Sequence, residues 1–525
     1  MNISSSVFQR VVLLFQTRLP KGWGSSLDTV SFLLFFFALL YSVTGIHGFM
    51  RGHMGWLGPD LYSVAINLDA SHFFMARGLM SDGSYMAYNH QPPAIFYFFN
   101  AVSHLGKDLF DKLQIAYFMS AGVLILGWYA MARVFRKLGY DPAVANFTVI
   151  VLGSTSFFTF YRALLSFDNF SVLVSAGLIY AFAIFEGRHG ATAAPNSIQS
   201  RIVATGICIA SLLVSWYVYP IIGFFLLGMF IFRVVKRQDW KTPFVAGFLV
   251  FVTMLALVAS LFYMNHRYMG NYQDIWDFLG GDAATNAKDL GVRYKPFLEL
   301  MKALYAQFSM LFPNRAAKFA LLILLLSGVG AVSIKKIRSL VSFDQTMRMP
   351  VLSILALLLG ASSFLYLTRY WSWIHPFGFP FLLMGFGIIL VWALSKLPAE
   401  IRQFLPLLTF VLSFHAAQIL QNEREGDVWR AKETQSLIDV VQTEFPRGYA
   451  LTLNTGCGIF NQGMFTYIAA YPNSFLSPNE KDVPSDKAVE VLCENNDTGE
   501  TVLRTKDGKR KYKILPFTIG YEKIR

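Results

Sequence analysis

Long apolar runs are the feature that most constrains how this chain can fold. The first of them, TVSFLLFFFALLYSVTGIHGF (residues 29–49), is long enough to cross a bilayer core of ~30 Å as a helix, which takes about 20 apolar residues. It lacks the small-residue cleavage site of a signal peptide, and similar runs follow, so we expect an anchor that the protein keeps. Because lipid leaves no partner for exposed peptide groups, each run is expected to be a helix. Charged residues make up only 15% of the chain, against about 25% in soluble domains, which also favours a polytopic α-helical membrane protein.

About eleven transmembrane helices are expected. They lie near residues 28–49, 114–135, 142–160, 169–186, 202–217, 219–233, 243–264, 316–334, 350–367, 377–395 and 403–420. The pair between 202 and 233 leaves two interpretations open. The stretch SWYVYP there is either a tight reversal between two short spans or a kink at Pro220.

The charges in the loops predict the orientation of these spans. If the N-terminus lies in the cytoplasm, every short connection on that side is basic, as the positive-inside rule requires. The basic residues concerned are Arg133, Arg136, Lys137, Arg188, Arg201, Arg233, Lys236, Arg237, Lys241, Lys335, Lys336, Arg338, Lys396 and Arg402. An odd number of spans then puts the C-terminus outside, and we expect a multi-pass protein of the inner (plasma) membrane. These loops also account for the net charge of +13, so no nucleic-acid partner is expected.

The polar tail, residues 421–525, has a different character from the rest. It contains the strand-like pieces YALTLN and RKYKILPFTIGYEKI and the helix-like piece VWRAKETQSLIDVVQTEF. We therefore predict a small α/β domain outside the membrane, after a transmembrane domain of residues 1–420. Cys208 lies in an apolar run and is expected to pack there, whereas a disulfide between Cys457 and Cys493 is left open.

The first outside loop, residues 50–113, combines charged residues with many aromatics. Its piece LDASHFFMARGLM places apolar residues and His72 at helical spacing, which predicts a helix in the membrane interface. The aromatics of YNHQPPAIFYFFN suit a second such helix, since Pro93 would stand in its first turn. We therefore expect Pro92 and Pro93 to form a hinge between two interface helices.

This loop resembles the first lumenal or periplasmic loop of the GT-C membrane glycosyltransferases. Among them it is most like the protein O-mannosyltransferases and the lipid A aminoarabinose transferase, the family 39-like enzymes. The pattern is carried by Asp69, then His72, then MARGLM, DGSY and NHQPP. Two positions depart from it. Ala70 stands where the family has a second acid, which leaves Asp69 as the single candidate base, and Gln91 separates His90 from the prolines.

Two later segments also match the resemblance. The family has another acid at the head of the fourth span, and YRALLSFDNFSVLV supplies Asp168 there. The family also shows Arg-Tyr followed by a proline-containing turn near a late span, where this chain has Arg369, Tyr370, His375 and Pro376. All of these residues fall outside the membrane under the orientation that loop charge predicts.

The resemblance implies a glycosyltransferase of GT-C type, with residues 1–420 as its catalytic domain and a polyprenyl-phosphate sugar as donor. Asp69 would be the base that takes the proton of the acceptor hydroxyl, and Asp168 a second catalytic residue. The leaving phosphate would need arginine donors, for which Arg369, Arg162 and Arg293 are candidates in that order. The residues expected to bind substrate are His72, His90, Arg162, Arg293, Arg369, Tyr370 and His375. The transferred group would be a hexosyl or pentosyl unit, and the acceptor a glycan, lipid or protein of the cell envelope.

Each of these residues also has a plain structural interpretation. Asp168 could only cap the fourth helix, and Arg369 could be an interfacial anchor beside its aromatic neighbours. His90 could orient the loop through backbone hydrogen bonds, and Asp69 could be a surface acid, as we expect for Asp60 and Asp82. For His375 the two interpretations are equal.

The sequence contains no Walker loop, no dinucleotide fingerprint, no HExxH and no metal-ligand spacing. No cofactor is therefore predicted, although a divalent metal is left open because carboxylates of separate outside loops can meet in space. Two rival functions remain. A transporter or flippase of lipid-linked or envelope components would carry ionisable residues within its spans, whereas here most lie at the outside ends. A membrane scaffold would act through its C-terminal domain.

Overall fold

The computed structural model describes most of the membrane-embedded helices and parts of the loops and tail. The residues described are 23–47, 61–68, 76–80, 85–87, 93–163, 165, 168–186, 198–215, 217–269, 351–367, 379–397, 399–445, 450–452, 475–477, 485–486, 488–495, 500–515 and 520–524.

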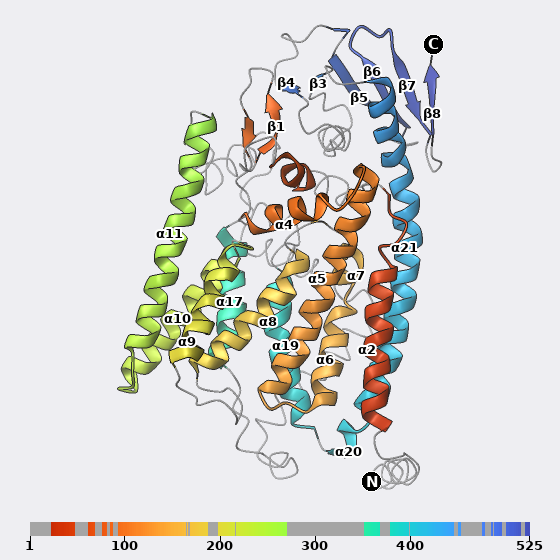
Figure 1. The fold of residues 1–525 in the computed structure, drawn as a ribbon. Coiled ribbons are helices and arrows are strands. Elements are labelled where there is room, and N and C mark those ends of the chain that lie inside the picture. Colours follow the sequence, from red (N-terminus) through yellow and green to blue (C-terminus); the bar gives the residue numbers. More distant parts are fainter. Residues whose placement is uncertain are drawn as a thin grey trace.

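A bundle of helices that run roughly along one common direction forms the body of the molecule (Figure 1). Its helices are α2 (Trp23–Tyr41), α5 (Leu109–Lys137), α6 (Pro142–Gly153), α8 (Asp168–Phe185), α9 (Ile198–Leu212), α10 (Val218–Val235), α11 (Lys241–Met269), α17 (Val351–Leu367), α19 (Phe379–Ser395) and α21 (Leu405–Glu444). Among the described residues, five helices are long and apolar enough to cross a membrane, and five shorter ones are also apolar. The chain is thus a multi-pass membrane protein, as the sequence predicts. The span expected at 316–334 lies outside the described residues, so the count of eleven stays a prediction.

Local signals place several helix ends where the sequence has capping residues. Asp108 accepts a hydrogen bond from the Asp111 amide at 2.9 Å at the start of α5. Asp141 accepts one from the Ala143 amide at 2.9 Å, with Pro142 as the first residue of α6. Such caps satisfy amides that have no partner within the helix.

The structure differs from the expected single span at 142–160. It forms two helices, α6 and the short α7 (Ser156–Tyr161). The hydroxyl of Ser154 donates to the Ile150 carbonyl and that of Thr155 to the Leu152 carbonyl, at 2.6 and 2.8 Å. The same two carbonyls also accept hydrogen bonds from the Ser154 and Thr155 amides, so the hydroxyls add a second donor to each carbonyl at the end of α6.

The stretch SWYVYP is a reversal between two helices, which settles the alternative left open by the sequence. Helix α9 ends at Leu212 and α10 begins at Val218, with Pro220 in its first turn. A proline in the first turn removes no helical hydrogen bond, so no kink arises. Cys208 is buried in α9, as its apolar surroundings predict.

Close backbone packing between α10 and α17 depends on Gly360. A Cβ added to Gly360 would lie 2.5 Å from the Ile221 Cα, whereas one added to Gly223 on α10 would meet nothing within 4 Å. We expect Gly360→Ala to destabilise the protein by about 1–3 kcal/mol through overpacking. Gly223→Ala, the matched control, should leave stability unchanged or raise it by up to about 1 kcal/mol, because alanine favours a helix. Thermal unfolding of both variants in detergent measures this, and equal midpoints would contradict the close contact.

Several short connections of the bundle lie at one end, opposite a β-sheet (Figure 1). The turns after α5, α10 and α19 lie at the lower end in this view, beside the start of α2. These are among the basic connections that the sequence groups on one side. These basic connections therefore lie together at one end of the bundle, as the sequence predicts. The compartment that this end faces stays a prediction.

The first outside loop is built differently from the expectation of two interface helices. Residues 61–67 are helical, and α4 (Ala94–Ser103) begins directly after Pro93, which confirms the second predicted helix. The first predicted helix is wrong over β1 (Ala76–Met80), which pairs with β2 (Tyr85–Ala87) in a hairpin. In the described residues, Pro93 is thus preceded by a strand hairpin and not by a helix. Helix α4 lies crosswise over the ends of the bundle helices (Figure 1).

The pairing of β1 gives the physical reason for this correction. Its other edge pairs in parallel with β4 (Phe475–Ser477), through Leu79 opposite Phe475 and Met80 opposite Leu476. These backbone hydrogen bonds come from the C-terminal tail and are invisible to local periodicity. The sheet has the order β2-β1-β4-β3-β5-β6-β7-β8, in which the remaining strands are β3 (Ala450–Thr452), β5 (Ala488–Asn495), β6 (Glu500–Thr505), β7 (Lys511–Ile514) and β8 (Tyr521–Ile524).

Helix α21 joins the bundle to this sheet. It has 40 residues and is therefore about 60 Å long. The span expected at 403–420 and the separate helix expected at 428–445 are thus one helix, and the predicted domain boundary at 421 falls inside it. Its first half packs beside α2, and its end reaches the sheet (Figure 1).

The end of α21 is fixed to the sheet by Glu444. The hydroxyls of Tyr512 and Tyr521 donate to its carboxylate at 2.5 and 3.3 Å, and the Arg510 guanidinium donates to its carbonyl at 3.2 Å. Desolvation, together with the hydrogen bond to Glu444, raises the pKa of Tyr512 to about 12.

This raised pKa predicts an alkaline loss of stability. The protonated hydroxyl is favoured in the folded state, so its contribution is complete below pH 10, the ordinary pKa, and is lost as pH rises through about 12. We expect the stability difference between wild type and Tyr512→Phe to be constant below pH 10 and to fall above it. Melting temperatures of both proteins, measured from pH 8 to 12, test this. A difference that does not change with pH would contradict it.

Candidate functional site

The structure describes two of the nine predicted site residues, Asp168 and Arg162. The other seven, Asp69, His72, His90, Arg293, Arg369, Tyr370 and His375, lie outside the described residues. The described segments that flank several of them in the sequence nevertheless have defined positions in the bundle.

The segment that leads into Asp69 is buried. Every residue from 61 to 68 is buried, and Tyr62 and Leu68 are fully so. Burial raises the pKa of the Tyr62 hydroxyl, which therefore stays protonated. Asp69 thus follows directly on a stretch of chain that packing holds in place.

The segment that follows His90 is anchored on two other parts of the predicted site. At the start of α4, the Ala94 amide donates to the Leu213 carbonyl at 3.1 Å, at the end of α9. Farther along α4, the rings of Phe98 and Phe99 contact the ring of Phe170 edge to face, with centroids 5.2 and 6.2 Å apart. Phe170 stands two residues after Asp168, so α4 lies against the head of α8.

The turn that carries Arg369, Tyr370 and His375 connects α17 to α19. Near the start of α19, the Phe381 ring stacks on the Tyr217 ring with centroids 6.1 Å apart. Tyr217 lies in the reversal between α9 and α10, close in sequence to the carbonyl that receives α4. The described flanks of the first loop, of Asp168 and of this turn therefore meet at one end of the bundle, the end that faces the sheet (Figure 1).

Asp168 is the first residue of α8 and is fully buried. Its carbonyl accepts a hydrogen bond from the Ser171 hydroxyl. A carboxylate in the first turn of a helix is stabilised by the helix dipole. The interpretation of Asp168 as a helix cap stays a prediction. Its catalytic role stays a prediction, and its position beside α4 is compatible with both.

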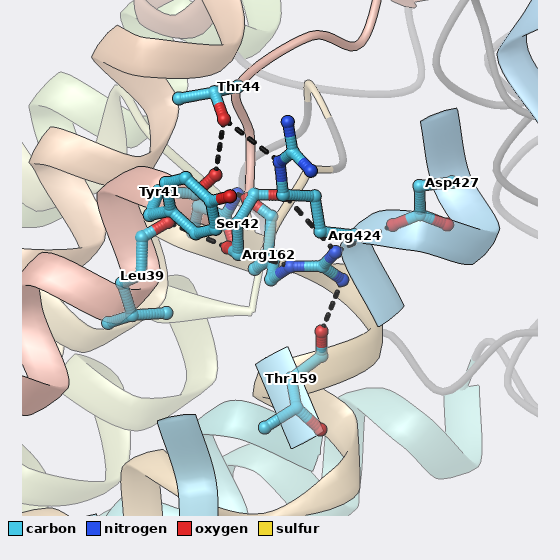
Figure 2. A network of polar contacts seen from close by, with 9 residues as sticks. Leu39, Tyr41, Ser42, Thr44, Thr159, Arg162, Arg424 and Asp427 are labelled. Atoms are coloured by element: carbon cyan, nitrogen blue, oxygen red, sulfur yellow. Dashed lines mark hydrogen bonds and ion pairs between the residues drawn. The ribbon is translucent and has the colours of Figure 1, made fainter. Parts of the chain in front are cut away.

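Arg162 is the centre of a buried polar network (Figure 2). Its side chain is fully buried, and its Nη2 forms an ion pair with Oδ2 of Asp427 on α21 at 2.8 Å. Its Nε donates to the Ser42 hydroxyl at 2.8 Å, and its Nη1 to the Thr159 carbonyl at 2.7 Å. The guanidinium therefore ties the ends of α2 and α7 to α21.

The same network reaches Asp168 through its neighbour. The side-chain amide of Asn169 donates to the Arg162 carbonyl at 3.0 Å and to the Ser120 hydroxyl on α5 at 2.7 Å. A buried guanidinium that is paired in this way is held rigidly, since breaking the pair would leave a charge without compensation. The network thus fixes the backbone on both sides of the loop that precedes Asp168.

A second arginine of α21 extends this contact to the turn after α2 (Figure 2). Arg424 donates from Nε to the Thr44 hydroxyl at 2.9 Å and lies over the Tyr41 ring, 4.7 Å from its centroid. Gly45 has a φ of 77°, which favours glycine, and its amide donates to the Gln114 side chain at 3.0 Å.

Sequence reasoning missed Asp427 and Arg424. Both stand in the polar part of α21, where a charged residue is ordinarily a solvated one. Their spacing of three places them on one face of a helix, which was the available signal. Only the packing of α21 against α2 and α7 shows that Asp427 is buried and Arg424 partly buried. Among the described residues, no group of three or more metal-ligating side chains could hold a metal ion.

Comparisons with known proteins find a similar fold in solved structures. No family model matches the sequence, and no curated protein matches it. The structure is similar to the crystal structure of ArnT from Cupriavidus metallidurans bound to undecaprenyl phosphate, with a TM-score of 0.52 and 13% identity, over 91% of this chain and 94% of that one. It is also similar to the Archaeoglobus fulgidus oligosaccharyltransferase in the apo form, with a TM-score of 0.51 and 12% identity, over 89% of this chain and 66% of that one. The chain therefore shares its fold with these two proteins, in agreement with the resemblance found in the sequence.

Proposed function

We propose that this chain, which has the GT-C fold, is a glycosyltransferase that moves a sugar from a polyprenyl-phosphate-linked donor to a cell-envelope acceptor. The observation that carries the proposal is the likeness to ArnT, a protein solved with undecaprenyl phosphate, over 91% of this chain. The described flanks of the motif-bearing segments also gather at one end of the bundle, as one active site would require. The sugar would be a hexosyl or pentosyl unit, and the acceptor a glycan, a lipid or a protein.

In the proposed reaction, an acceptor hydroxyl attacks the anomeric carbon of the donor sugar. The new carbon–oxygen bond forms as the bond from that carbon to the phosphate oxygen breaks. The polyprenyl phosphate leaves with the electron pair of the broken bond, and Asp69 accepts the proton of the hydroxyl. The buried segment before Asp69 would hold this base in place, and Asp168 would act from the head of α8.

The leaving phosphate requires positive charge or hydrogen-bond donors. Arg369 remains the first candidate, because its turn joins α17 to α19 at the end of the bundle that faces the sheet. Arg162 is buried against Asp427, so it would reach the phosphate only if that ion pair opened. Arg293 keeps its place as the third candidate, and His72, His90, Tyr370 and His375 would bind sugar or acceptor.

The sheet, and the end of the bundle beside it, would face the periplasm or the cell exterior. The N-terminus would lie in the cytoplasm. The donor's lipid tail would then stay in the bilayer while its head group enters the site. Two features would hold the tail in a fixed position beside this site: α21 is continuous, and the first loop contributes strands to the sheet of the tail.

A transfer assay tests the proposal against the transporter alternative. The full chain would be reconstituted in vesicles with a polyprenyl-phosphate sugar labelled in the sugar, together with an envelope extract as acceptor source. We expect label to move to the acceptor with release of polyprenyl phosphate. Label that crosses the bilayer while still joined to its lipid would instead favour a flippase and sink the enzyme assignment.

A further inference from the structure

The turn between α10 and α11 forms a small open cavity at the end of the bundle opposite the sheet. The cavity has a volume of about 500 Å³ and is lined by Phe230, Val234, Arg237, Gln238 and Trp240. Helices α10 and α11 lie side by side above it (Figure 1). It is remote from the proposed catalytic end, so sugar transfer gives it no role.

The backbone at Arg237 carries an unusual conformation. Its φ is 52°, and among the described residues it is the only one other than glycine with a positive φ. The Gln238 amide donates to the Arg233 carbonyl at 2.8 Å and the Arg237 amide to the Val234 carbonyl at 3.1 Å. These two bonds define a Schellman motif, whose left-handed position usually belongs to glycine. An arginine at this position costs about 1 kcal/mol or more relative to glycine, so the turn alone does not explain why an arginine stands there.

Three cations stand in or beside the turn that forms the cavity, and one of them, Arg237, lines it. Lys236, Arg237 and Lys241 are exposed, and none has a carboxylate partner among the described residues. The nearby Asp239 is already engaged by Arg201 at 3.4 Å and by the Thr242 hydroxyl at 2.6 Å. The turn therefore presents an excess of positive charge.

The walls next to these cations are apolar and uncovered. Trp240 is 44% exposed and Phe244 55% exposed, and their rings contact each other and that of Phe230. On α10, Leu227 and Ile231 are also exposed. A tryptophan at a helix end beside exposed apolar residues is typical of the membrane interface, where its ring sits at headgroup level.

We propose that this turn is a binding site for the headgroup of an anionic phospholipid. The phosphate would lie between Arg237 and the two lysines, because a guanidinium binds phosphate oxygens through paired hydrogen bonds. The acyl chains would run along the exposed faces of α10 and α11. A free phosphate ion shares the headgroup chemistry, but the apolar walls favour the lipid. The proposal is independent of the proposed sugar transfer.

Arg237→Gly is the decisive variant, because glycine adopts the backbone of this turn without a Cβ penalty. The variant should fold at least as stably as the wild type while lacking the cation. Lys and Arg near a membrane surface contribute about 1 kcal/mol each, which corresponds to about fivefold in affinity. We therefore expect about fivefold weaker binding for Arg237→Gly, and about 100-fold weaker binding when Lys236→Gln and Lys241→Gln are added.

The measurement is a native mass spectrometry titration of the full chain in neutral detergent. Phosphatidylglycerol should bind more tightly than phosphatidylcholine with the same acyl chains. The control is Arg133→Gln, which removes one exposed charge from α5 at the same end of the bundle but away from the cavity. Unchanged binding in Arg237→Gly, or an equal loss in Arg133→Gln, would overturn the proposal. So would displacement of the lipid by millimolar inorganic phosphate, since the site would then hold a free anion.

Discussion

Replacing Asp69 by asparagine is expected to lower the rate of sugar transfer by about 10²–10⁴-fold, the range that a general base contributes. The amide keeps the size of the carboxylate but cannot accept the proton of the acceptor hydroxyl. Because the preceding segment is fully buried and unchanged, the variant should fold normally. Initial rates of transfer from labelled lipid carrier, in membranes with matched amounts of protein, measure the effect.

Asp82→Asn is the matched control for this experiment. It is the same substitution in the same loop, at a position where we expect an acid that only solvates the surface. Its transfer rate should stay within about threefold of wild type, since surface substitutions rarely disturb function or stability. Near wild-type transfer by Asp69→Asn, with normal expression, would remove Asp69 as the base while leaving the glycosyltransferase assignment open.

Replacing Asp427 by asparagine is expected to destabilise the protein by about 3–5 kcal/mol. The change leaves the Arg162 guanidinium buried with its positive charge uncompensated, and a broken buried ion pair has a cost of this size. Thermal unfolding in detergent, followed by loss of the soluble protein, measures the drop. The half-exposed pair between Arg402 and Asp141, at 3.3 Å, supplies the control. Arg402→Gln should lower the stability by no more than about 1 kcal/mol.

The double variant Arg162→Met with Asp427→Leu separates the structural from the catalytic role of Arg162. Removing both charges together should restore most of the lost stability, because apolar replacements of a buried pair are often neutral. If Arg162 also contacts the donor phosphate, the stable double variant will still transfer sugar poorly. If it regains both stability and transfer, Arg162 only holds the loop before Asp168. A single Asp427→Asn variant as stable as wild type would contradict the buried pair itself.

The helical part of the fold follows from short-range features of the sequence. Apolar runs of sufficient length can satisfy their backbone in lipid only as helices, and the structure has helices at ten of the eleven expected places, the other lying outside the described residues. The starts of α4 after Pro93, of α5 after Asp108 and of α6 after Asp141 also depend only on residues next to them in the sequence. The resemblance to GT-C enzymes rests on motif order in the first loop, and the fold is similar to those of ArnT and of the Archaeoglobus fulgidus oligosaccharyltransferase.

The structure differs from what the local sequence pattern indicates where segments far apart in the chain pack together. Helical spacing at residues 68–79 indicated a helix, yet β1 forms because β4, far along the chain, offers a strand edge. Similarly, the sequence changes from apolar to polar near residue 421, yet α21 continues past this point and its polar half packs on the sheet and on Arg162. The division into two domains stays a prediction. Of the site residues, only Asp168 and Arg162 are described, and for Arg162 the burial against Asp427 could not be foreseen.

Apolar runs in the sequence already predict a chain that spans a membrane many times, and the order of motifs in its loops already resembles that of GT-C glycosyltransferases. Each of these follows from length, polarity or motif order along the chain. The three-dimensional structure was needed to show that the first loop and the tail share one sheet, that α21 is a single helix, and that Arg162 is paired with Asp427. The physical reason is that strand pairing and charge burial depend on partners hundreds of residues away. Those partners meet only once the chain has folded.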